Sequence, residues 1–354
     1  MMRKVPYRQL DRDRVDAYVS RHPNATAYHF SAWMGAVEKA YQHDGWYIVS
    51  ENDAGTIDGL LPLCRLKLPF GRSSLVSLPF CDLSGPLSDS ITIEKQMIEE
   101  AIGLLPELGA RKLELRRAGE SMVDSVTHES GGAVKVSMLA GLPDSAEALF
   151  EGFKAKLRSQ IRKAEKNGLS FELGEGAVGV EHFYKVFARN MKRLGSPVHD
   201  RRWFEAIQAL YGKQAVIGLV RYDERIVGAG LILIHPHRVS IPWASTLAEY
   251  NHLAPNMLLY WELMKVACTH NAKLFDFGRS TMGEGTFRFK KQWGAEPRRL
   301  SWDEYNRTGL VNPVTPAKPS LMSRLRPWVE SGWQALPDPI ANRVGPKLRR
   351  YISL

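Results

Sequence analysis

The sequence predicts an α/β protein in which one fold occurs twice in tandem. An internal repeat runs through most of the chain, and each copy alternates apolar, strand-like segments with helical ones. The length of 354 residues supports this interpretation, because it is long for one domain and comfortable for two at roughly 150 residues each. We expect mixed, mostly antiparallel sheets that are covered by helices.

The repeat consists of four short patterns that return in the same order. Each match alone is weak, but four in one order are not expected by chance. The pairs are Trp33-x-x-Ala36-Val37-x-x-x-Tyr41 with Trp203-x-x-Ala206-Ile207-x-x-x-Tyr211, Ile57-Asp58-Gly59 with Ile226-Val227-Gly228, Ser77-Leu78-Pro79-Phe80 with Ser240-Ile241-Pro242-Trp243, and Lys112-Leu113 with Lys273-Leu274.

The second copy shows the order of the elements most clearly. A mostly apolar helix begins at Pro255, a residue suited to the first helical position, and ends by Asn271. Because this helix has almost no polar face, we expect it to be buried against a sheet. The other expected elements are a helix at 202–210 and strands at 215–221, 226–234, 238–244 and 274–277. An antiparallel meander with a helix before its last strand is the order of the GNAT-type acyltransferase core.

Composition and cysteine spacing bound the class of protein. With 44% hydrophobic and 24% charged residues, the chain is typical of soluble globular proteins. The N-terminus is polar and no 18-residue apolar span is present, so we expect a cytoplasmic protein. The cysteines Cys64, Cys81 and Cys268 are far apart, which predicts buried, reduced thiols. Neither they nor the ten histidines form a ligand motif, and we predict no metal site.

The positive charge of the chain is concentrated at its C-terminal end. Of the net charge of +10, the segment 306–354 contributes eight Lys or Arg residues against two acids. This distribution disfavours a nucleic-acid groove that spreads over the body of the protein. The segment also holds seven of the twenty prolines. Its end, 342–354, is basic and partly apolar, and two interpretations remain open: it clamps the body, or it lies on the anionic inner face of a membrane.

These observations divide the chain into four parts. We predict an N-terminal GNAT-like domain at 1–143, a basic linker helix at 144–168 that opens the second domain, a C-terminal GNAT-like domain at 169–305, and a basic, proline-rich tail at 306–354.

The linker helix carries a basic ridge. We expect it to begin with a capping box of Asp144 and Glu147 and to stop at Asn167-Gly168. Lys154, Arg158, Arg162 and Lys166 follow one another at a spacing of four, where like charges oppose each other by a few tenths of a kcal/mol per pair. The ridge is either a solvated face or the binding surface of an anionic ligand, and such a ligand would remove the repulsion.

A second group of polar residues follows the last strand of the second copy. The run Phe275-Asp276-Phe277-Gly278-Arg279-Ser280 leads through a glycine-flanked loop into Gly285-Thr286-Phe287-Arg288-Phe289-Lys290-Lys291-Gln292-Trp293-Gly294. One acid, guanidinium groups, a hydroxyl and two lysines therefore lie close to the end of one strand, where α/β sheets commonly hold ligands. The corresponding strand of the first copy carries Glu114, Arg116 and Arg117, so we place the active site in the second copy.

These motifs together resemble the FemAB family of peptidyl and aminoacyl transferases. The resemblance rests on the linker helix, on Asn190-Met191-Lys192-Arg193-Leu194-Gly195-Ser196-Pro197, on the block from Asp276 to Arg279, and on the run Gly285–Gly294. The last run is similar to a branch that is associated with exosortase (PEP-CTERM) systems and exopolysaccharide loci. The resemblance covers roughly residues 25–305 and implies two tandem GNAT-like domains.

The resemblance also implies a reaction: transfer of an acyl or aminoacyl group to an amino group of an envelope or exopolysaccharide precursor. Lys290 would then lie at the reacting carbonyl, and either Asp276 or the leaving group would take the proton of the amine. The expected substrate-binding residues are Arg279, Ser280, Arg288, Lys154, Arg158, Arg162 and Asn190, with Trp243 and Tyr260 as pocket aromatics or core residues.

The donor and two alternative functions stay open. Family members use aminoacyl-tRNA, and relatives of the wider group use acyl-CoA, so we expect a co-substrate and no tightly bound cofactor. The stretch 248–254 before the buried helix has no glycine, which disfavours a conventional CoA pyrophosphate loop. The alternatives are an acyl-CoA-dependent N-acyltransferase that acts on a nucleotide sugar, and a non-catalytic assembly factor that binds a polyanionic glycan or a membrane.

Overall fold

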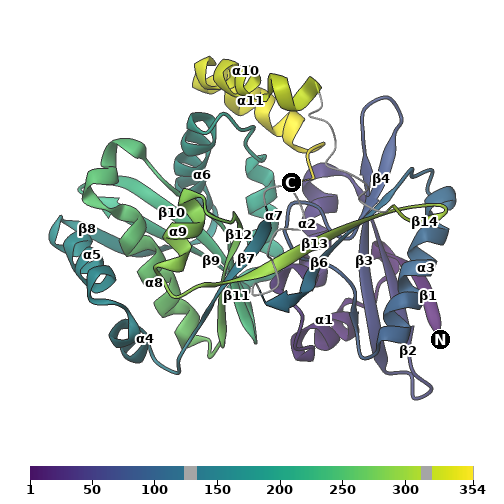
Figure 1. Ribbon diagram of the computed structural model, residues 1–354. Helices are drawn as coiled ribbons and strands as arrows, with labels where there is room; N and C mark the ends of the chain where they lie inside the picture. The colour runs from purple at the N-terminus through teal and green to yellow at the C-terminus, as the bar shows by residue number, and fades with distance from the viewer. Residues whose placement is uncertain (123–133, 312–320, 354) are drawn as a thin grey trace. The chain divides into compact units, whose positions relative to one another are not determined.

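The computed structural model describes residues 1–122, 134–311 and 321–353, and these form two compact units (Figure 1). The first unit comprises Met1–Ser137, Pro297–Pro316 and Tyr351–Leu354. The second comprises Met138–Glu296 and Ala317–Arg350. The chain thus returns to the first unit twice, at Pro297 and at Tyr351, which differs from the predicted boundaries at 305 and 306. Part of the predicted tail, 312–320, lies outside the described residues.

The first unit is a sheet with the strand order β1-β2-β3-β4-β6-β13. Short strands β5 (Leu87–Ser88) and β14 (Gly309–Leu310) pair with β3 and β13. The main elements in chain order are β1 (Met2–Pro6), α1 (Arg12–Arg21), α2 (Ser31–Tyr41), β2 (Asp44–Glu51), β3 (Ile57–Lys67), β4 (Ser73–Val76), α3 (Ile91–Glu107), β6 (Leu113–Met122) and β13 (Glu296–Asn306).

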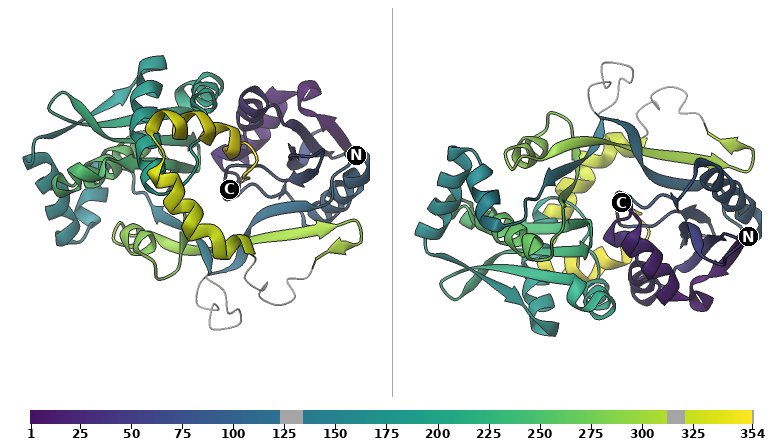
Figure 2. Two further views of the ribbon diagram at one scale, coloured as in Figure 1. Left: turned by 90° about the horizontal axis from the view of Figure 1, so that it is seen from above. Right: turned by 90° about the horizontal axis from the view of Figure 1, so that it is seen from below.

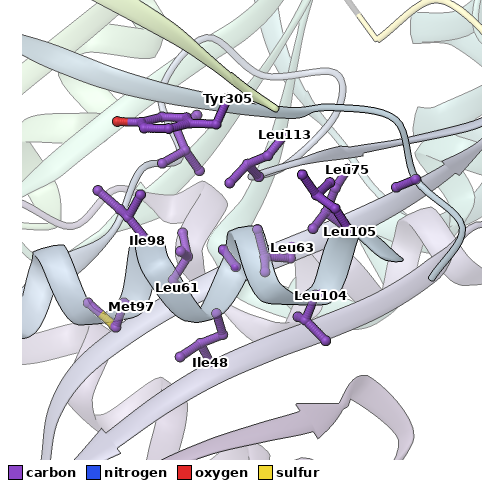
Figure 3. Close-up of a cluster of buried hydrophobic side chains, with 13 residues drawn as sticks. Ile48, Leu61, Leu63, Leu75, Met97, Ile98, Leu104, Leu105, Leu113 and Tyr305 are labelled. Atoms are coloured by element: carbon purple, nitrogen blue, oxygen red, sulfur yellow. The ribbon is translucent and has the colours of Figure 1, made fainter. Parts of the chain in front are cut away.

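Helix α3 closes the core of the first unit (Figure 3). Its N-cap is Ser90, whose hydroxyl accepts the N–H of Ile93 at 3.2 Å. The apolar residues of the helix recur at helical spacing and meet side chains of β2, β3, β4 and β6 together with Tyr305 of β13. Each fully buried large apolar side chain stabilises the fold by about 1.5–3 kcal/mol. Figure 3 labels Ile48, Leu61, Leu63, Leu75, Met97, Ile98, Leu104, Leu105, Leu113 and Tyr305 of this cluster.

The second unit is a sheet with the strand order β7-β12-β11-β10-β9-β8. Helix α8 covers one face of it, and α6 and α7 cover the other (Figure 1). The elements are β7 (Lys135–Gly141), α4 (Ala146–Gly152), α5 (Ala155–Lys166), β8 (Leu169–Gly174), α6 (Gly176–Arg193), α7 (Arg201–Tyr211), β9 (Ala215–Tyr222), β10 (Arg225–His235), β11 (Arg238–Thr246), α8 (Pro255–Thr269), β12 (Leu274–Thr281), α9 (Gly285–Lys291), α10 (Leu321–Ala335) and α11 (Asp338–Arg349).

The predicted repeat is present in the structure. Helices α2 and α7, strands β2–β4 and β9–β11, helices α3 and α8, and strands β6 and β12 follow each other in the same order. In each unit the strands of the meander are antiparallel, while the pair that follows the long helix, β4 with β6 or β11 with β12, is parallel. The fold class, two tandem mixed sheets covered by helices, is therefore confirmed.

The predicted linker helix is not continuous. Two helices, α4 and α5, take its place, because Phe153 between them is extended (ψ 146°). The ring of Phe153 packs against Trp261 and Trp293, with centroids 5.9 and 5.5 Å away. The cap also differs from the prediction: Ser145 accepts the N–H of Ala148 at 3.1 Å, in place of a box that begins at Asp144.

The C-terminal helices α10 and α11 pack on α6 and meet each other at an angle (Figure 2). Lys192 Nζ lies 2.7 Å from a carboxylate oxygen of Asp338, and the side-chain amide of Gln334 donates to the Arg193 carbonyl at 2.9 Å. Ala341 of α11 is buried. This part of the tail therefore docks on the second unit. No helix among the described residues is long and apolar enough to cross a bilayer.

One contact between helix α11 and the rest of the second unit is expected to depend on pH. Arg349 Nε donates to His199 Nε2 at 3.1 Å, which requires that this imidazole nitrogen carries no proton. Burial, assisted by the Arg349 charge, lowers the pKa of His199 well below its ordinary value. The unfolded chain thus binds a proton near pH 6.5 that the folded chain excludes. Stability from this group is fully present above pH 6.5 and is lost as the pH falls below it.

We therefore expect the free energy of unfolding to fall, through His199 alone, by up to about 1.4 kcal/mol per pH unit below pH 6.5. The measurement is urea denaturation at pH 7.5 and pH 5.5 for the wild type and for His199→Gln. Carboxylates titrate equally in both proteins, so the difference between the two pH slopes isolates the imidazole. Equal slopes would show that His199 takes up its proton equally in the folded and in the unfolded protein.

Candidate active site

The candidate active site lies where two parallel strands of the second unit stop pairing. β11 and β12 pair at three positions, from Arg238 opposite Leu274 to Ser240 opposite Asp276. Both strands continue beyond these positions, β11 to Thr246 and β12 to Thr281. Paired residues share one face of a sheet, so Ser240 and Asp276 are side by side although 36 positions separate them in the chain.

Both strands change course at this point. β11 bulges, because Leu233 of β10 pairs with Ser240 whereas Leu231 pairs with Trp243. Pro242 lies within the bulge and has no N–H for a ladder, which fits such a position. β12 turns at Gly278, whose φ of 70° is accessible to glycine at little cost.

Gly278 holds the predicted carboxylate in place. The Gly278 N–H donates to Asp276 Oδ1 at 2.9 Å, and Arg238 lies 3.8 Å from Asp276 Oδ2. Only 4% of Asp276 is exposed. A carboxylate that is buried to this degree depends on such partners, because an isolated charge in the interior is costly.

Gly278 also holds the predicted lysine. Lys290, from α9, is 8% exposed, and its ammonium group donates to the carbonyl oxygens of Gly278 at 3.1 Å and Arg279 at 2.8 Å. The two residues predicted as catalytic are therefore hydrogen-bonded to one glycine, Asp276 to its N–H and Lys290 to its C=O. Asp276 and Lys290 thus share a contact with Gly278, and their catalytic roles stay predictions.

Three buried polar atoms on β11 and β12 have no hydrogen-bond partner among the described residues. They are Ser240 Oγ, Ser280 Oγ and Arg238 Nε. An unpaired buried polar atom costs about 1–3 kcal/mol, and such atoms in native proteins commonly mark a ligand or a bound water. Ser280 was predicted, whereas Ser240 and Arg238 were not. The repeat pattern that begins at Ser240 was the available signal.

The first unit has no counterpart of this acid. Counted from the matching lysines Lys112 and Lys273, Leu115 holds the position of Asp276. Leu115 is fully buried in the core of the first unit. This difference between the copies supports the prediction that the second copy carries the chemistry.

Two further predicted residues flank the turn. Arg279, next to Gly278 on β12, is half-buried. Arg288 on α9 is exposed, and its guanidinium donates to the Gly283 carbonyl at 2.7 Å, so it closes the loop between β12 and α9.

The predicted aromatics fall into two groups. Tyr260 of α8 stacks on Phe277 at 5.5 Å and lies 5.1 Å from Phe289, the residue before Lys290. Burial raises the pKa of Tyr260 to about 12, so its hydroxyl is protonated at physiological pH and can donate.

Trp243 belongs to a different cluster. Its ring lies 5.0 Å from Phe204, 6.0 Å from His199 and 6.3 Å from Trp203. Trp243 therefore packs between β11 and α7, which favours the core interpretation over the pocket one.

The basic ridge is partly used by the fold itself. Arg158 donates to the carbonyl oxygens of Glu151 and Phe153 at 2.8 and 2.9 Å, which satisfies the free C-terminal end of α4. Arg162 lies over the ring of Phe150 at 5.3 Å. Both arginines thus join α5 to α4.

Lys154 and Asn190 lie elsewhere in the second unit. Lys154 is the exposed N-cap residue of α5. Asn190 of α6 donates to Ser245 Oγ at 3.1 Å and accepts from Arg193 at 2.9 Å. It lines a cavity of about 350 Å³ between α6, the end of β11 and the tail helices.

Comparison with known proteins identifies the fold. A family model described as an acetyltransferase (GNAT) domain matches residues 152–291. A UDP-N-acetylmuramoylpentapeptide-lysine N(6)-alanyltransferase from Weissella viridescens is 21% identical over 141 residues, which are 40% of this chain and 41% of that protein. The crystal structure of FemX superposes with a TM-score of 0.68 at 16% identity, over 84% of this chain and 95% of that chain. The chain has the tandem GNAT fold of the FemAB proteins.

Two further solved structures share this fold. L-PGS from Bacillus licheniformis superposes with a TM-score of 0.53 at 14% identity, over 89% of this chain and 96% of that chain. A tandem GNAT protein from the clavulanic acid biosynthesis pathway gives 0.50 at 14% identity, over 90% and 100%. The predicted resemblance to the FemAB family is confirmed at the level of the fold, and the GNAT family model matches a stretch of the second unit. The matched stretch spans about two fifths of the Weissella enzyme.

Proposed function

We propose that this FemAB-type protein transfers an acyl or aminoacyl group to an amino group of a cell-envelope or exopolysaccharide precursor. One observation carries the proposal: the Gly278 N–H donates to a buried carboxylate and its C=O accepts from a buried ammonium group, on a pair of strands with two buried hydroxyls that have no partner among the described residues. A buried site with both charges and open hydrogen-bonding groups is typical of catalysis rather than of structural packing.

The arrangement fits the attack of an amine on an ester or thioester. The amine nitrogen forms a bond to the acyl carbon, and the bond from that carbon to the leaving oxygen or sulfur breaks. Lys290 supplies positive charge for the oxyanion that develops on the carbonyl oxygen. The proton of the amine goes to Asp276 or to the leaving group. The hydroxyls of Ser240 and Ser280 orient the donor or the acceptor.

Aminoacyl-tRNA and acyl-CoA are both candidate donors. In the structure the stretch before α8 is a short 3₁₀ helix, Ala248–Leu253, and Ala254 at φ 63° leads into α8. A glycine-rich pyrophosphate loop is thus replaced by a structured turn, which favours a donor other than acyl-CoA. The link to exosortase systems stays a prediction from the sequence.

One observation favours the assembly-factor alternative. Helix α11 exposes Ile340, Val344 and Leu348 at a spacing of four, with Arg343 and Lys347 exposed beside them. An apolar stripe with basic neighbours is typical of helices that lie on an anionic membrane surface. This surface is also compatible with a transferase whose precursor is attached to a lipid.

A screen of the purified protein separates the two functions. Thermal stability is measured with acyl-CoAs, charged tRNA, UDP-amino sugars and anionic vesicles, and the acceptors are examined by mass spectrometry. A donor present at 100 times its Kd adds about 2.7 kcal/mol to the free energy of unfolding, enough to raise the Tm by a few degrees. Stabilisation by one donor, with the matching mass gain on an amine, supports the transferase and names its chemistry. Binding to vesicles without any transfer would refute it.

A further inference from the structure

The last described residues of the chain occupy a site in the first unit. The Phe80 N–H donates to the Ser353 carbonyl oxygen at 2.6 Å, and the Arg116 guanidinium donates to the same oxygen at 3.3 Å. Arg116 also donates to the Ser353 hydroxyl at 3.0 Å. Ser353 is thus held at its main chain and at its side chain by two residues of the first unit.

The site is built independently of Ser353. Arg116 is fully buried, and its guanidinium donates to Glu114 Oε1 at 2.8 and 2.9 Å and to the Cys81 carbonyl at 2.6 Å. It also lies over the ring of Trp302 at 4.8 Å. These contacts fix the plane of the guanidinium, so its remaining donors point in a set direction before any ligand binds.

The other donor has an unusual backbone. Phe80 has φ 68°, a conformation that costs a bulky residue energy and that persists where the surrounding structure imposes it. The neighbouring loop is tied to β6, because the Ser77 N–H donates to the Glu114 carbonyl and the Ser84 N–H to the Arg116 carbonyl, both at 2.9 Å. The strained residue and the buried arginine therefore converge on one carbonyl oxygen.

The site lies where the two parallel strands β4 and β6 of the first unit stop pairing. β4 and β6 pair in parallel at Leu75–Leu113 and Val76–Glu114 before they part, as β11 and β12 do in the second unit. The loop that contains Phe80 repeats the segment 240–243 of β11. Ser353 thus binds at the first unit's counterpart of the candidate active site.

We propose that this is a binding site for the main chain of an extended peptide, and that the C-terminus of the chain closes it in cis. The chemistry selects the ligand class. Glu114 already balances the charge of Arg116, so the site favours an uncharged carbonyl with an adjacent hydroxyl over a phosphate. This proposal is independent of the transferase reaction, because it concerns the first unit, in which Leu115 holds the position of Asp276.

The test uses a chain that ends at Arg350 and a fluorescently labelled synthetic peptide with the sequence of residues 349–354. The shortened protein is expected to bind the peptide saturably. The full chain is expected to bind it at least tenfold more weakly, because its own end competes at an effective concentration in the millimolar range. In the shortened chain, Arg116→Gln is expected to abolish binding, whereas Arg117→Gln, whose partners are Glu94 and Asp303, retains it.

A second measurement needs no protein variant, which matters because Arg116→Gln can impair folding. A peptide with valine in place of Ser353 loses the hydroxyl that Arg116 contacts, so its Kd is expected to rise about tenfold. Inorganic phosphate at equal concentration is not expected to displace the peptide. Absence of binding to a folded shortened chain, or equal binding by both chain lengths, would overturn the proposal.

Discussion

Replacing Lys290 by alanine is expected to lower kcat by about 10²- to 10³-fold, the usual loss when one group that stabilises an oxyanion is removed. The ammonium group is held by two carbonyl oxygens of β12, so its position is fixed before the substrate binds. Catalysis gains from such pre-organisation, since no rearrangement is needed as charge develops. KM is expected to change much less than kcat, because the interaction strengthens only in the transition state.

The Lys290→Ala protein also loses two structural hydrogen bonds, so the experiment must separate a loss of catalysis from a loss of stability. Two carbonyl groups lose a charged donor, which costs about 1–3 kcal/mol of folding free energy. The neighbouring Lys291→Ala is the matched control, because Lys291 is exposed and lies over Phe287. Steady-state kinetics and Tm are measured for both variants with the donor found in the screen. A Lys290→Ala protein that is folded and keeps kcat within threefold of the wild type would remove Lys290 from the mechanism.

Local sequence patterns predicted those elements of the fold that depend on burial alone. Helix α8 and strands β9, β10 and β11 begin and end within two residues of the expected positions. Their apolar runs are long and are bounded by turn residues, so propensity and burial agree. β12 runs four residues further than expected, to Thr281, because glycine at position 278 turns the strand rather than ending it.

The errors arose where tertiary contacts overrode a local pattern. The stretch from Asp144 to Asn167 has helical periodicity throughout, yet Phe153 is extended because its ring enters the cluster with Trp261 and Trp293. That break also decides the role of Arg158, which turns back to the carbonyl oxygens that the end of α4 leaves open. Sequence spacing alone presents the same arginine as part of a ligand surface.

The candidate site was predictable in part for a similar reason. Asp276, Ser280 and Lys290 lie within fifteen residues, so one motif contains them. Ser240 and Arg238 reach the site only through the parallel register of β11 with β12, and no local pattern encodes that register. The repeat supplied an indirect signal, since Ser77 and Ser240 begin the same pattern in the two copies.

Replacing Asp276 by asparagine decides which group takes the proton from the attacking amine. The amide oxygen of asparagine can still accept the Gly278 N–H, so the turn of β12 is expected to keep its shape while the charge is lost. If Asp276 is the base, kcat falls by about 10²- to 10⁴-fold, the range for the loss of a positioned general base. If the leaving group takes the proton, kcat stays within threefold, and Asp276 is a positioning residue.

The internal repeat suggests a second variant that tests whether Asp276 takes the proton of the amine. Asp276→Leu places in the second copy the residue that the first copy carries as Leu115. Leucine cannot serve as a base and leaves Arg238 without its nearest acid, so a loss of stability is expected along with the loss of turnover. Tm and kcat of the two variants together separate the roles. If the Asp276→Asn protein is stable but inactive, Asp276 is a catalytic base. If the Asp276→Asn protein is active while the Asp276→Leu protein is unstable and inactive, Asp276 is a structural partner of Arg238.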